Sequence, residues 1–145
     1  MVETNGVAQL VGQCVAKVVD VEAAVEAIAQ ATAELEGLYV VLGHPHALNA
    51  SARSRNLLKP AASNAASVLH RGEVLLRYDK QSLPNYQVFD EQRYFVPGHR
   101  AGVFEVKGLR LGLLICEDAW VSGPAQQAVD AGAQALLLLN ASPFH

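Results

Sequence analysis

A cysteine stands at the end of a short apolar segment, GLRLGLLICEDAW, which spans residues 108–120. Its leucines and isoleucine predict a buried strand of the parallel type, opened by a glycine and closed by acidic residues. Cys116 directly follows that strand, at the position where open α/β sheets bind their ligands. Free cysteine is also among the most buried residue types, so a core cysteine is the alternative at this position.

Lys80 is the second group that could do chemistry. It follows the predicted strand Glu73 to Tyr78, so we expect Lys80 and Cys116 to project from the same edge of one sheet. A nearby ammonium favours the thiolate, which is the nucleophilic form of cysteine, and can stabilise the oxyanion that forms when a carbonyl is attacked. Such a pair still needs a base to move protons, most naturally a carboxylate.

The composition is typical of a well-buried globular chain. Hydrophobic residues make up 51% and charged residues 17% of the 145 residues, which argues against disorder and fits one α/β domain. The formal charge of -3 gives no basis for binding nucleic acid or an anionic membrane. No apolar run approaches the roughly 20 residues of a membrane span. The only cysteines, Cys14 and Cys116, predict no disulfide framework and a cytoplasmic location.

Helical and extended patterns alternate along the chain and predict a layered, mixed α/β sheet with flanking helices. The N-terminal half predicts a strand at Val7 to Leu10, a helix at Asp20 to Glu36 that Gly37 ends, and a strand at Leu38 to Leu42. Two strand pairs follow: Asn64 to His70 with Glu73 to Tyr78, and Val103 to Val106 with Leu109 to Ile115. Their predicted turns are Arg71-Gly72 and Lys107-Gly108. A helix from Gly123-Pro124 through Ala131 and a buried strand at Ala135 to Leu139 come last.

Three segments are predicted as loops. Ala47 to Ser63 is small and polar, with at most a short helix over Ala52 to Leu58. Gln81 to Arg100 is unusually long, and its four aromatic residues favour an ordered, functional loop. We place His44-Pro45-His46 in a loop at a strand's end. A metal site there is disfavoured, because no carboxylate or cysteine stands at a supporting spacing.

Longer stretches around Lys80 and Cys116 resemble a known family. These stretches are RYDKQSLPNY at 77–86, VFDEQRYF with Pro97-Gly98 at 88–98, GLLICEDAW at 112–120, and LNASPFH at 139–145. They are similar to the nitrilase superfamily of carbon–nitrogen hydrolases, and most closely to the glutaminase domain of glutamine-dependent NAD synthetases. The resemblance runs from about Leu38 to His145, interrupted by the Ala47 to Ser63 loop.

The resemblance implies an α-β-β-α sandwich in which a Glu–Lys–Cys triad hydrolyses the side-chain amide of glutamine. It implies that Cys116 is the nucleophile, that Lys80 stabilises the oxyanion, and that Glu91 orients the lysine. It also implies a synthetase domain that uses ATP and the released ammonia to convert deamido-NAD to NAD. No metal or cofactor is implied for the amidase step itself.

The resemblance further implies which residues line the glutamine pocket: Tyr86, Glu117, Trp120 and Ser142. Their chemistry suits a free amino acid, which needs acceptors for its ammonium and apolar walls for its stem. Each residue also fits an ordinary structural role. Tyr86 and Trp120 fit as core aromatics, Glu117 as a strand-end charge, and Ser142 as a loop residue.

The family pattern is incomplete in this chain. The triad glutamate and the segment around it, which follows the family's second strand, have no counterpart in the sequence. We therefore expect residues 1–145 to form a single, partial carbon–nitrogen hydrolase (glutaminase) domain without the synthetase domain. We expect poor activity from it alone, because general acid–base catalysis is typically worth about 100- to 10,000-fold in rate.

Three functions remain open from the sequence. The leading one is glutamine hydrolysis for NAD synthesis, and the second is hydrolysis of another small amide by the same superfamily chemistry. The third is a non-catalytic remnant that forms a homo-oligomer, or binds a synthetase domain, through an unpaired sheet edge.

Overall fold

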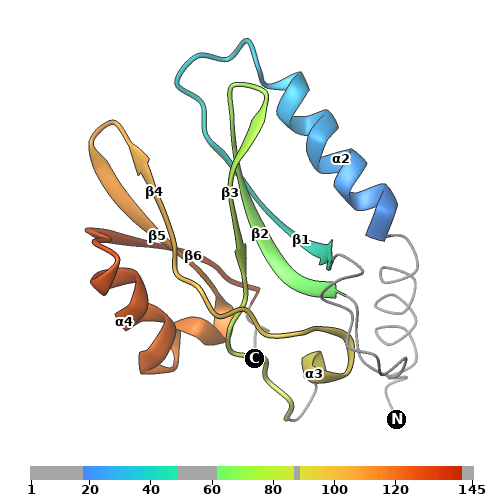
Figure 1. The fold of residues 1–145 in the computed structure, drawn as a ribbon, viewed down its shortest axis with the longest axis vertical. Helices are drawn as coiled ribbons and strands as arrows, with labels where there is room; N and C mark the ends of the chain where they lie inside the picture. Colours follow the sequence, from blue (N-terminus) through green and yellow to red (C-terminus); the bar gives the residue numbers. More distant parts are fainter. Residues whose placement is uncertain (1–17, 49–61, 87–88, 142–145) are drawn as a thin grey trace.

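Two three-stranded β-sheets lie between two helices in the computed structural model, which describes residues 18–48, 62–86 and 89–141 (Figure 1). The elements are α2 (Val18–Ala31), β1 (Val40–Ala47), β2 (Ala62–His70), β3 (Glu73–Asp79), α3 (Glu91–Tyr94), β4 (Gly102–Val106), β5 (Leu109–Ile115), the 3-10 helix η1 (Cys116–Ala119), α4 (Ser122–Asp130) and β6 (Ala135–Leu139). This layering confirms the predicted α/β sandwich. The predictions for Val7 to Leu10, Ala52 to Leu58, Cys14 and Ser142 lie outside the described residues.

Both predicted hairpins are present, one in each sheet. The first sheet has the order β1-β2-β3 and is antiparallel throughout. In the second sheet β4 pairs with β5 antiparallel, and β6 pairs with β5 in parallel after the α4 crossover. The two turns share one geometry, with φ of 51° at Arg71 and Lys107 and 84° at the glycine that follows each. Positive φ at both turn residues is the conformation that two-residue hairpins favour, and glycine adopts it without strain.

The main core lies between the two sheets. Ala66, Val68 and Tyr78 from the first sheet pack in one cluster with Phe104, Leu113, Leu114 and Ile115 from the second. Since strand side chains alternate between faces, Leu69 points the other way and packs against Val25 and Ala29 of α2. Strand β2 is therefore buried on both faces, and it connects the helix layer to the sheet-on-sheet core.

Helix α2 is shorter than the sequence predicts. It ends at Ala31 rather than Glu36, and the Thr32 hydroxyl donates hydrogen bonds to the carbonyls of Ile28 (2.9 Å) and Ala29 (3.0 Å). Such local bonds offer the backbone an alternative to continuing the helix. Leu35, which we placed on the buried helical face, is 53% exposed beyond that end.

Strand β6 has the predicted bounds but is not buried as predicted. Leu136 is 48% and Leu138 is 42% exposed. Within the described residues β6 pairs only with β5, so it forms an edge of the second sheet. Apolar side chains on an edge strand lack a neighbouring strand that would help to cover them. The local sequence pattern does not indicate whether a strand lies at an edge, so it could not predict this exposure.

The prediction that His44-Pro45-His46 forms a loop is wrong, because all three residues belong to β1. Proline is tolerated there since β1 is an edge of its sheet among the described residues. The His44 ring contacts Ser67 Oγ through Nε2 (2.7 Å) and the Pro45 carbonyl through Nδ1 (3.0 Å). His46 pairs with Glu22 of α2, which also binds Arg77 at 2.8 Å. These side chains form a polar layer between α2 and the first sheet.

This polar layer makes two groups harder to protonate. Burial lowers the pKa of His44 below its ordinary value of 6.5, although its contact with the Pro45 carbonyl opposes the shift. Burial alone would raise the pKa of Glu22, but the hydrogen bond with His46 and the charge of Arg77 lower it overall. Both groups bind protons less readily in the folded chain than in the unfolded one, so falling pH destabilises the fold.

We expect the free energy of unfolding to fall as the pH drops below about 6.5, where His44 protonates in the unfolded chain but resists it in the fold. Thermal melting at a series of pH values measures this decline. His44→Gln removes the titrating group and should flatten the decline between pH 7 and His44's lower folded pKa. His99→Gln, a change at an exposed loop residue, should leave it unchanged. An equal decline in wild type and His44→Gln would contradict the prediction.

Candidate active site

Lys80 is buried at the end of β3. Its backbone N–H donates to the Asn64 carbonyl (2.8 Å), and its own carbonyl accepts from the Gly98 N–H (2.8 Å). Its side chain is 1% exposed, and Nζ donates to Glu91 Oε1 at 2.7 Å. Glu91 comes from α3 in the long loop, and its other oxygen lies 3.4 Å from Asn64 Nδ2. An ammonium removed from water requires such a partner, so the two side chains hold each other in place.

Cys116 lies at a sharp turn between β5 and η1. Its φ is 47°, a left-handed conformation that is uncommon for residues other than glycine and is often found at functional sites. The turn stops the strand abruptly, and the thiol is half-buried. The Cys116 side chain therefore has two environments, because it packs against the edge of the main core and also lines a cavity.

Lys80, Glu91 and Cys116 meet in one cavity of about 270 Å³. Its walls combine polar and apolar groups: Gly43, Asn64, Lys80, Phe89, Glu91, Ile115, Cys116, Leu139, Asn140 and Ala141. We predicted that the lysine and the cysteine share the edge of one sheet, and this is wrong. Lys80 follows a strand of the first sheet and Cys116 a strand of the second, and the stacking of the sheets brings their ends together.

Two of the predicted pocket residues form a pair beside this cavity. The Tyr86 hydroxyl donates to both Glu117 oxygens, at 3.1 and 3.0 Å. This hydrogen bond to a carboxylate raises the pKa of Tyr86. Trp120 ends η1 and is 76% exposed, and it does not line the cavity within the described residues. Ser142 lies outside the described residues.

Two polar side chains that line the cavity, those of Asn64 and Asn140, were not predicted from the sequence. Asn64 lies near the start of β2 among small residues, where an extended run reads as ordinary strand. Asn140 follows β6 directly, just as Cys116 follows the parallel neighbour β5. The rule that ligands bind beyond the carboxyl ends of parallel strands was therefore a usable signal for Asn140.

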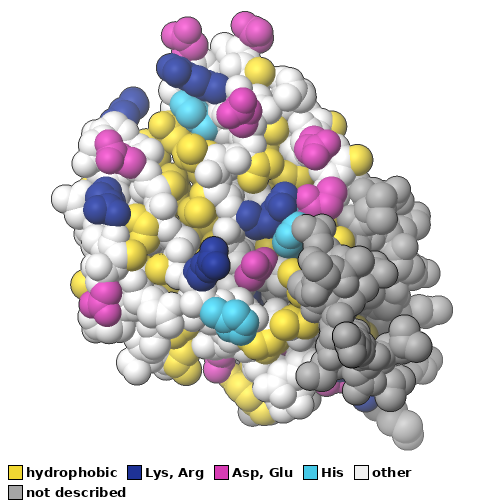
Figure 2. All heavy atoms as spheres, in the orientation of Figure 1, with side chains coloured by type: hydrophobic (Ala, Val, Ile, Leu, Met, Phe, Trp, Pro, Cys, Tyr) yellow, Lys and Arg dark blue, Asp and Glu magenta, His cyan; other side chains and the backbone are white. Residues whose placement is uncertain are grey.

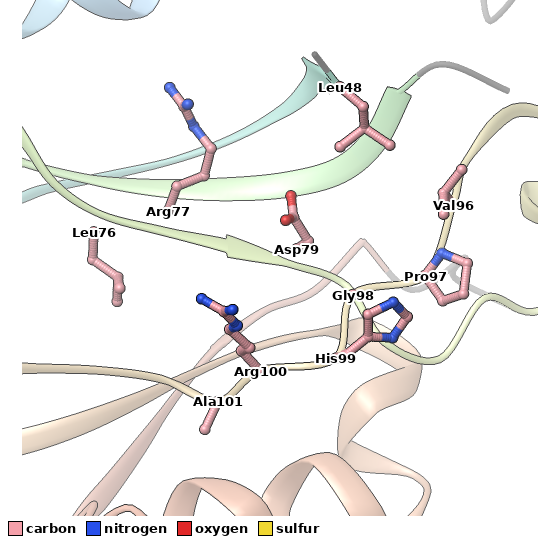
Figure 3. A pocket seen from close by; sticks show the side chains of 10 residues that line it. All are labelled: Leu48, Leu76, Arg77, Asp79, Val96, Pro97, Gly98, His99, Arg100 and Ala101. Carbon is pink, nitrogen blue, oxygen red and sulfur yellow. The ribbon is translucent and has the colours of Figure 1, made fainter. Parts of the chain in front are cut away.

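A larger hollow of about 620 Å³ lies elsewhere, between β3 and the loop that precedes β4 (Figure 3). Arg77 and Asp79 extend from β3, and His99 and Arg100 come from the loop (Figure 3). Arg77 is bound to Glu22 and Asp79 accepts a hydrogen bond from Ser63. No thiol lines this hollow among the residues that the structure describes. On the face shown in Figure 2, basic and acidic side chains are interspersed. The smaller cavity around Cys116 is thus the candidate site for covalent chemistry.

The described ranges are residues 18–48, 62–86 and 89–141. No group of three or more His, Cys, Asp or Glu side chains in them is arranged to hold a metal ion. No helix in the same ranges is long and apolar enough to cross a membrane.

Residues 9–145 match the family model described as carbon-nitrogen hydrolase. The chain is 42% identical over 125 residues to a glutamine-dependent NAD(+) synthetase from Xylella fastidiosa (strain Temecula1), covering 85% of this chain and 21% of that protein. A synthetase of the same name from Acinetobacter baylyi is 49% identical over 81 residues, covering 56% of this chain and 15% of that protein. The chain therefore spans about a fifth or less of the length of these relatives.

Solved structures give the same comparison in three dimensions. A glutamine-dependent NAD+ synthetase from Acinetobacter baumannii, in complex with ADP, superposes with a TM-score of 0.65 at 36% identity, covering 74% of this chain and 19% of that one. An amidase mutant from Nesterenkonia sp. AN1, with acrylamide added at its active-site cysteine, superposes with a TM-score of 0.68 over 92% of this chain and 47% of that one. At 24% identity, the second comparison supports the fold alone.

Proposed function

Because the chain belongs to the carbon–nitrogen hydrolase family, we propose that it attacks the side-chain amide of glutamine with Cys116 as the nucleophile. One observation carries the proposal: a buried Lys80–Glu91 ion pair and the Cys116 thiol line the same small cavity. The choice of glutamine is supported by the relatives, which are named glutamine-dependent NAD(+) synthetases.

The proposed reaction has two halves. Cys116 Sγ forms a bond to the amide carbon, the carbon–nitrogen bond breaks, and ammonia leaves with the proton that the thiol gave up. Water then attacks the resulting thioester, which releases glutamate and returns a proton to the sulfur. The overall change is hydrolysis of one amide, so this chemistry uses the chain's own side chains and water, with no cofactor.

Lys80 stabilises the charge that develops in each half. When sulfur or water attacks the carbonyl carbon, the carbonyl oxygen becomes an oxyanion, and a pre-positioned ammonium lowers the energy of that state. Since Lys80 is buried, its charge acts in a medium of low dielectric and is weakly screened. Glu91 orients the ammonium through its 2.7 Å contact.

The Tyr86–Glu117 pair is proposed to recognise the amino-acid end of glutamine. Glu117 is next to Cys116 in sequence, and its carboxylate is a suitable acceptor for an α-ammonium. The Tyr86 hydroxyl holds that carboxylate in place by bonding both of its oxygens. Trp120 and Ser142 remain predicted pocket residues. This recognition favours glutamine over a simple amide that has no ammonium group.

Slow turnover is part of the proposal. Glu91 is the only carboxylate among the described residues that line the cavity, and it is engaged by Lys80 and Asn64. Among the described residues that line the cavity, no free carboxylate is therefore available to take the proton from the thiol and give it to the leaving ammonia. We propose that the ammonia of the complete enzyme passes to a synthetase domain that uses ATP and deamido-NAD, in the cytoplasm.

Covalent labelling with an electrophilic glutamine analogue tests the proposal without requiring turnover. We expect one adduct by intact mass, located at Cys116, that excess glutamine suppresses and that Cys116→Ala abolishes. Cys14→Ser, which replaces the only other cysteine, should label like the wild type. Indiscriminate labelling of both cysteines, or none, would refute the proposal.

A second candidate is association through β6. Its exposed Leu136 and Leu138 lie on an edge strand, and such edges pair readily with another chain. This candidate would lead if no glutamine-sensitive adduct forms. The molecular mass in solution, measured by light scattering, then tests it, since a monomer would exclude the homo-oligomer.

A further inference from the structure

Asp118 is a fully buried carboxylate that the proposed reaction does not use. It is 0% exposed, and all four of its hydrogen-bond donors are neutral groups. Oδ2 accepts from the Tyr78 hydroxyl (2.8 Å) and the Ile115 N–H (3.1 Å). Oδ1 accepts from the N–H groups of Gln81 (3.1 Å) and Ser82 (2.8 Å). A buried carboxylate persists only when its oxygens are satisfied in this way.

The positions of these donors matter more than their number. Ile115 immediately precedes Cys116, and Gln81 and Ser82 immediately follow Lys80. One side chain therefore connects the backbone at the thiol to the backbone at the ammonium, although the two segments belong to different sheets. Two exposed side-chain hydrogen bonds, Tyr86 to Glu117 and Gln81 to Gln127, also connect the loop after Lys80 to the chain after Cys116.

Tyr78 reinforces this connection. Burial, together with the charge and hydrogen bond of Asp118, raises the pKa of Tyr78 far above its ordinary value of 10. Its hydroxyl therefore stays protonated and remains a donor to Asp118 at any pH used for an assay. Tyr78 lies two residues before Lys80, so the carboxylate holds the chain on both sides of the lysine.

We propose that Asp118 is a positioning residue, whose carboxylate fixes the separation between Lys80 and Cys116 by bonding the backbone beside each. The inference deepens the proposed function and rests on it for the identity of the reacting groups. Asp118 acts through Lys80, since it is not among the described residues that line the cavity. Misplacement of a reacting group by about 1 Å can lower a rate about 100-fold, which sets the expected scale of the effect.

The test is the rate at which iodoacetamide alkylates Cys116 in the full chain, followed by intact mass. Asp118→Asn keeps the size of the side chain but presents either an amide N–H or a weaker carbonyl to the four donors. We expect it to slow alkylation about 10- to 100-fold. In a Lys80→Met background the same change should have little further effect, because two residues that act as a unit give non-additive losses. The pH profile of Asp118→Asn should approach that of Lys80→Met.

Two further variants keep this test decisive. Asp130→Asn changes an exposed aspartate of α4 and should alkylate at the wild-type rate. Tyr78→Phe removes one donor and keeps the carboxylate, so it should slow alkylation about 3- to 10-fold if Asp118→Asn fails to fold. Alkylation at the wild-type rate in Asp118→Asn or Tyr78→Phe would overturn the inference. So would a double variant, Asp118→Asn with Lys80→Met, whose rate falls by the product of the two single losses. Failure of the proposed function is distinct: glutamine would then not protect the wild-type thiol, a result that does not depend on any Asp118 variant.

Discussion

Replacing Lys80 with methionine is expected to slow the labelling of Cys116 by an electrophilic glutamine analogue about 100- to 1,000-fold, the range seen when one oxyanion-stabilising group is removed. Methionine keeps most of the length of the side chain and removes its charge. Lys80 is 1% exposed and lines the same cavity as the thiol, so its charge is weakly screened and its loss is not offset by a neighbouring cation among the described residues that line the cavity. The rate constant for adduct formation at saturating analogue measures the effect, separately from binding.

The stability of the fold must be separated from this effect. Lys80→Met leaves Glu91, which is 19% exposed, without its partner, and an unpaired, partly buried charge destabilises a fold. The double variant Lys80→Met/Glu91→Gln removes both charges and should recover melting temperature without recovering labelling. Lys107→Met, at the exposed hairpin turn, serves as the matched control. Labelling that recovers in the double variant would contradict a direct role for the lysine charge.

Gly98→Ala is expected to destabilise the fold severely. A Cβ at residue 98 would lie 2.2 Å from the Asp79 carbonyl oxygen, which is backbone of β3 and cannot rotate away. The Gly98 N–H also donates to the Lys80 carbonyl at 2.8 Å, so separating the two segments breaks a hydrogen bond to the backbone of Lys80. We expect a loss of about 3 kcal/mol or more, which corresponds to a fall in melting temperature of about 10 °C for a domain of this size.

Gly123→Ala makes the same chemical change where there is room for it. Gly123 lies in the first turn of α4, and a Cβ there would meet nothing within 4 Å. The better helix propensity of alanine and the steric restriction that Pro124 places on the residue before it oppose each other, so we expect the free energy of unfolding to change by less than about 1 kcal/mol. Equal melting temperatures for Gly98→Ala and wild type would mean that the contact with Asp79 is relieved at little cost. Labelling of Cys116 in Gly98→Ala should fall together with stability.

Local patterns in the sequence were sufficient to predict most elements and the positions of Lys80 and Cys116 directly after two strands. The Arg71-Gly72 and Lys107-Gly108 turns were predicted correctly because a cation–glycine pair between extended runs is a short-range signal. Strand β5 and the placement of Cys116 after it followed from one apolar run and its acidic end. Glu91 was singled out by resemblance alone, and the structure places it 2.7 Å from the lysine it was expected to orient.

Long-range packing decided the rest. Periodicity could not indicate that Lys80 and Cys116 belong to separate sheets, since which strands pair depends on contacts far apart in sequence. His44 lies in a strand rather than a loop. Its buried ring contacts the hydroxyl of Ser67 on the neighbouring strand, a contact between residues far apart in sequence. Asp118 read as one more charge at a strand's end. Only the stacking of the two sheets brings the backbone after Lys80 within hydrogen-bond distance of the Asp118 carboxylate. That stacking is a property of the folded core.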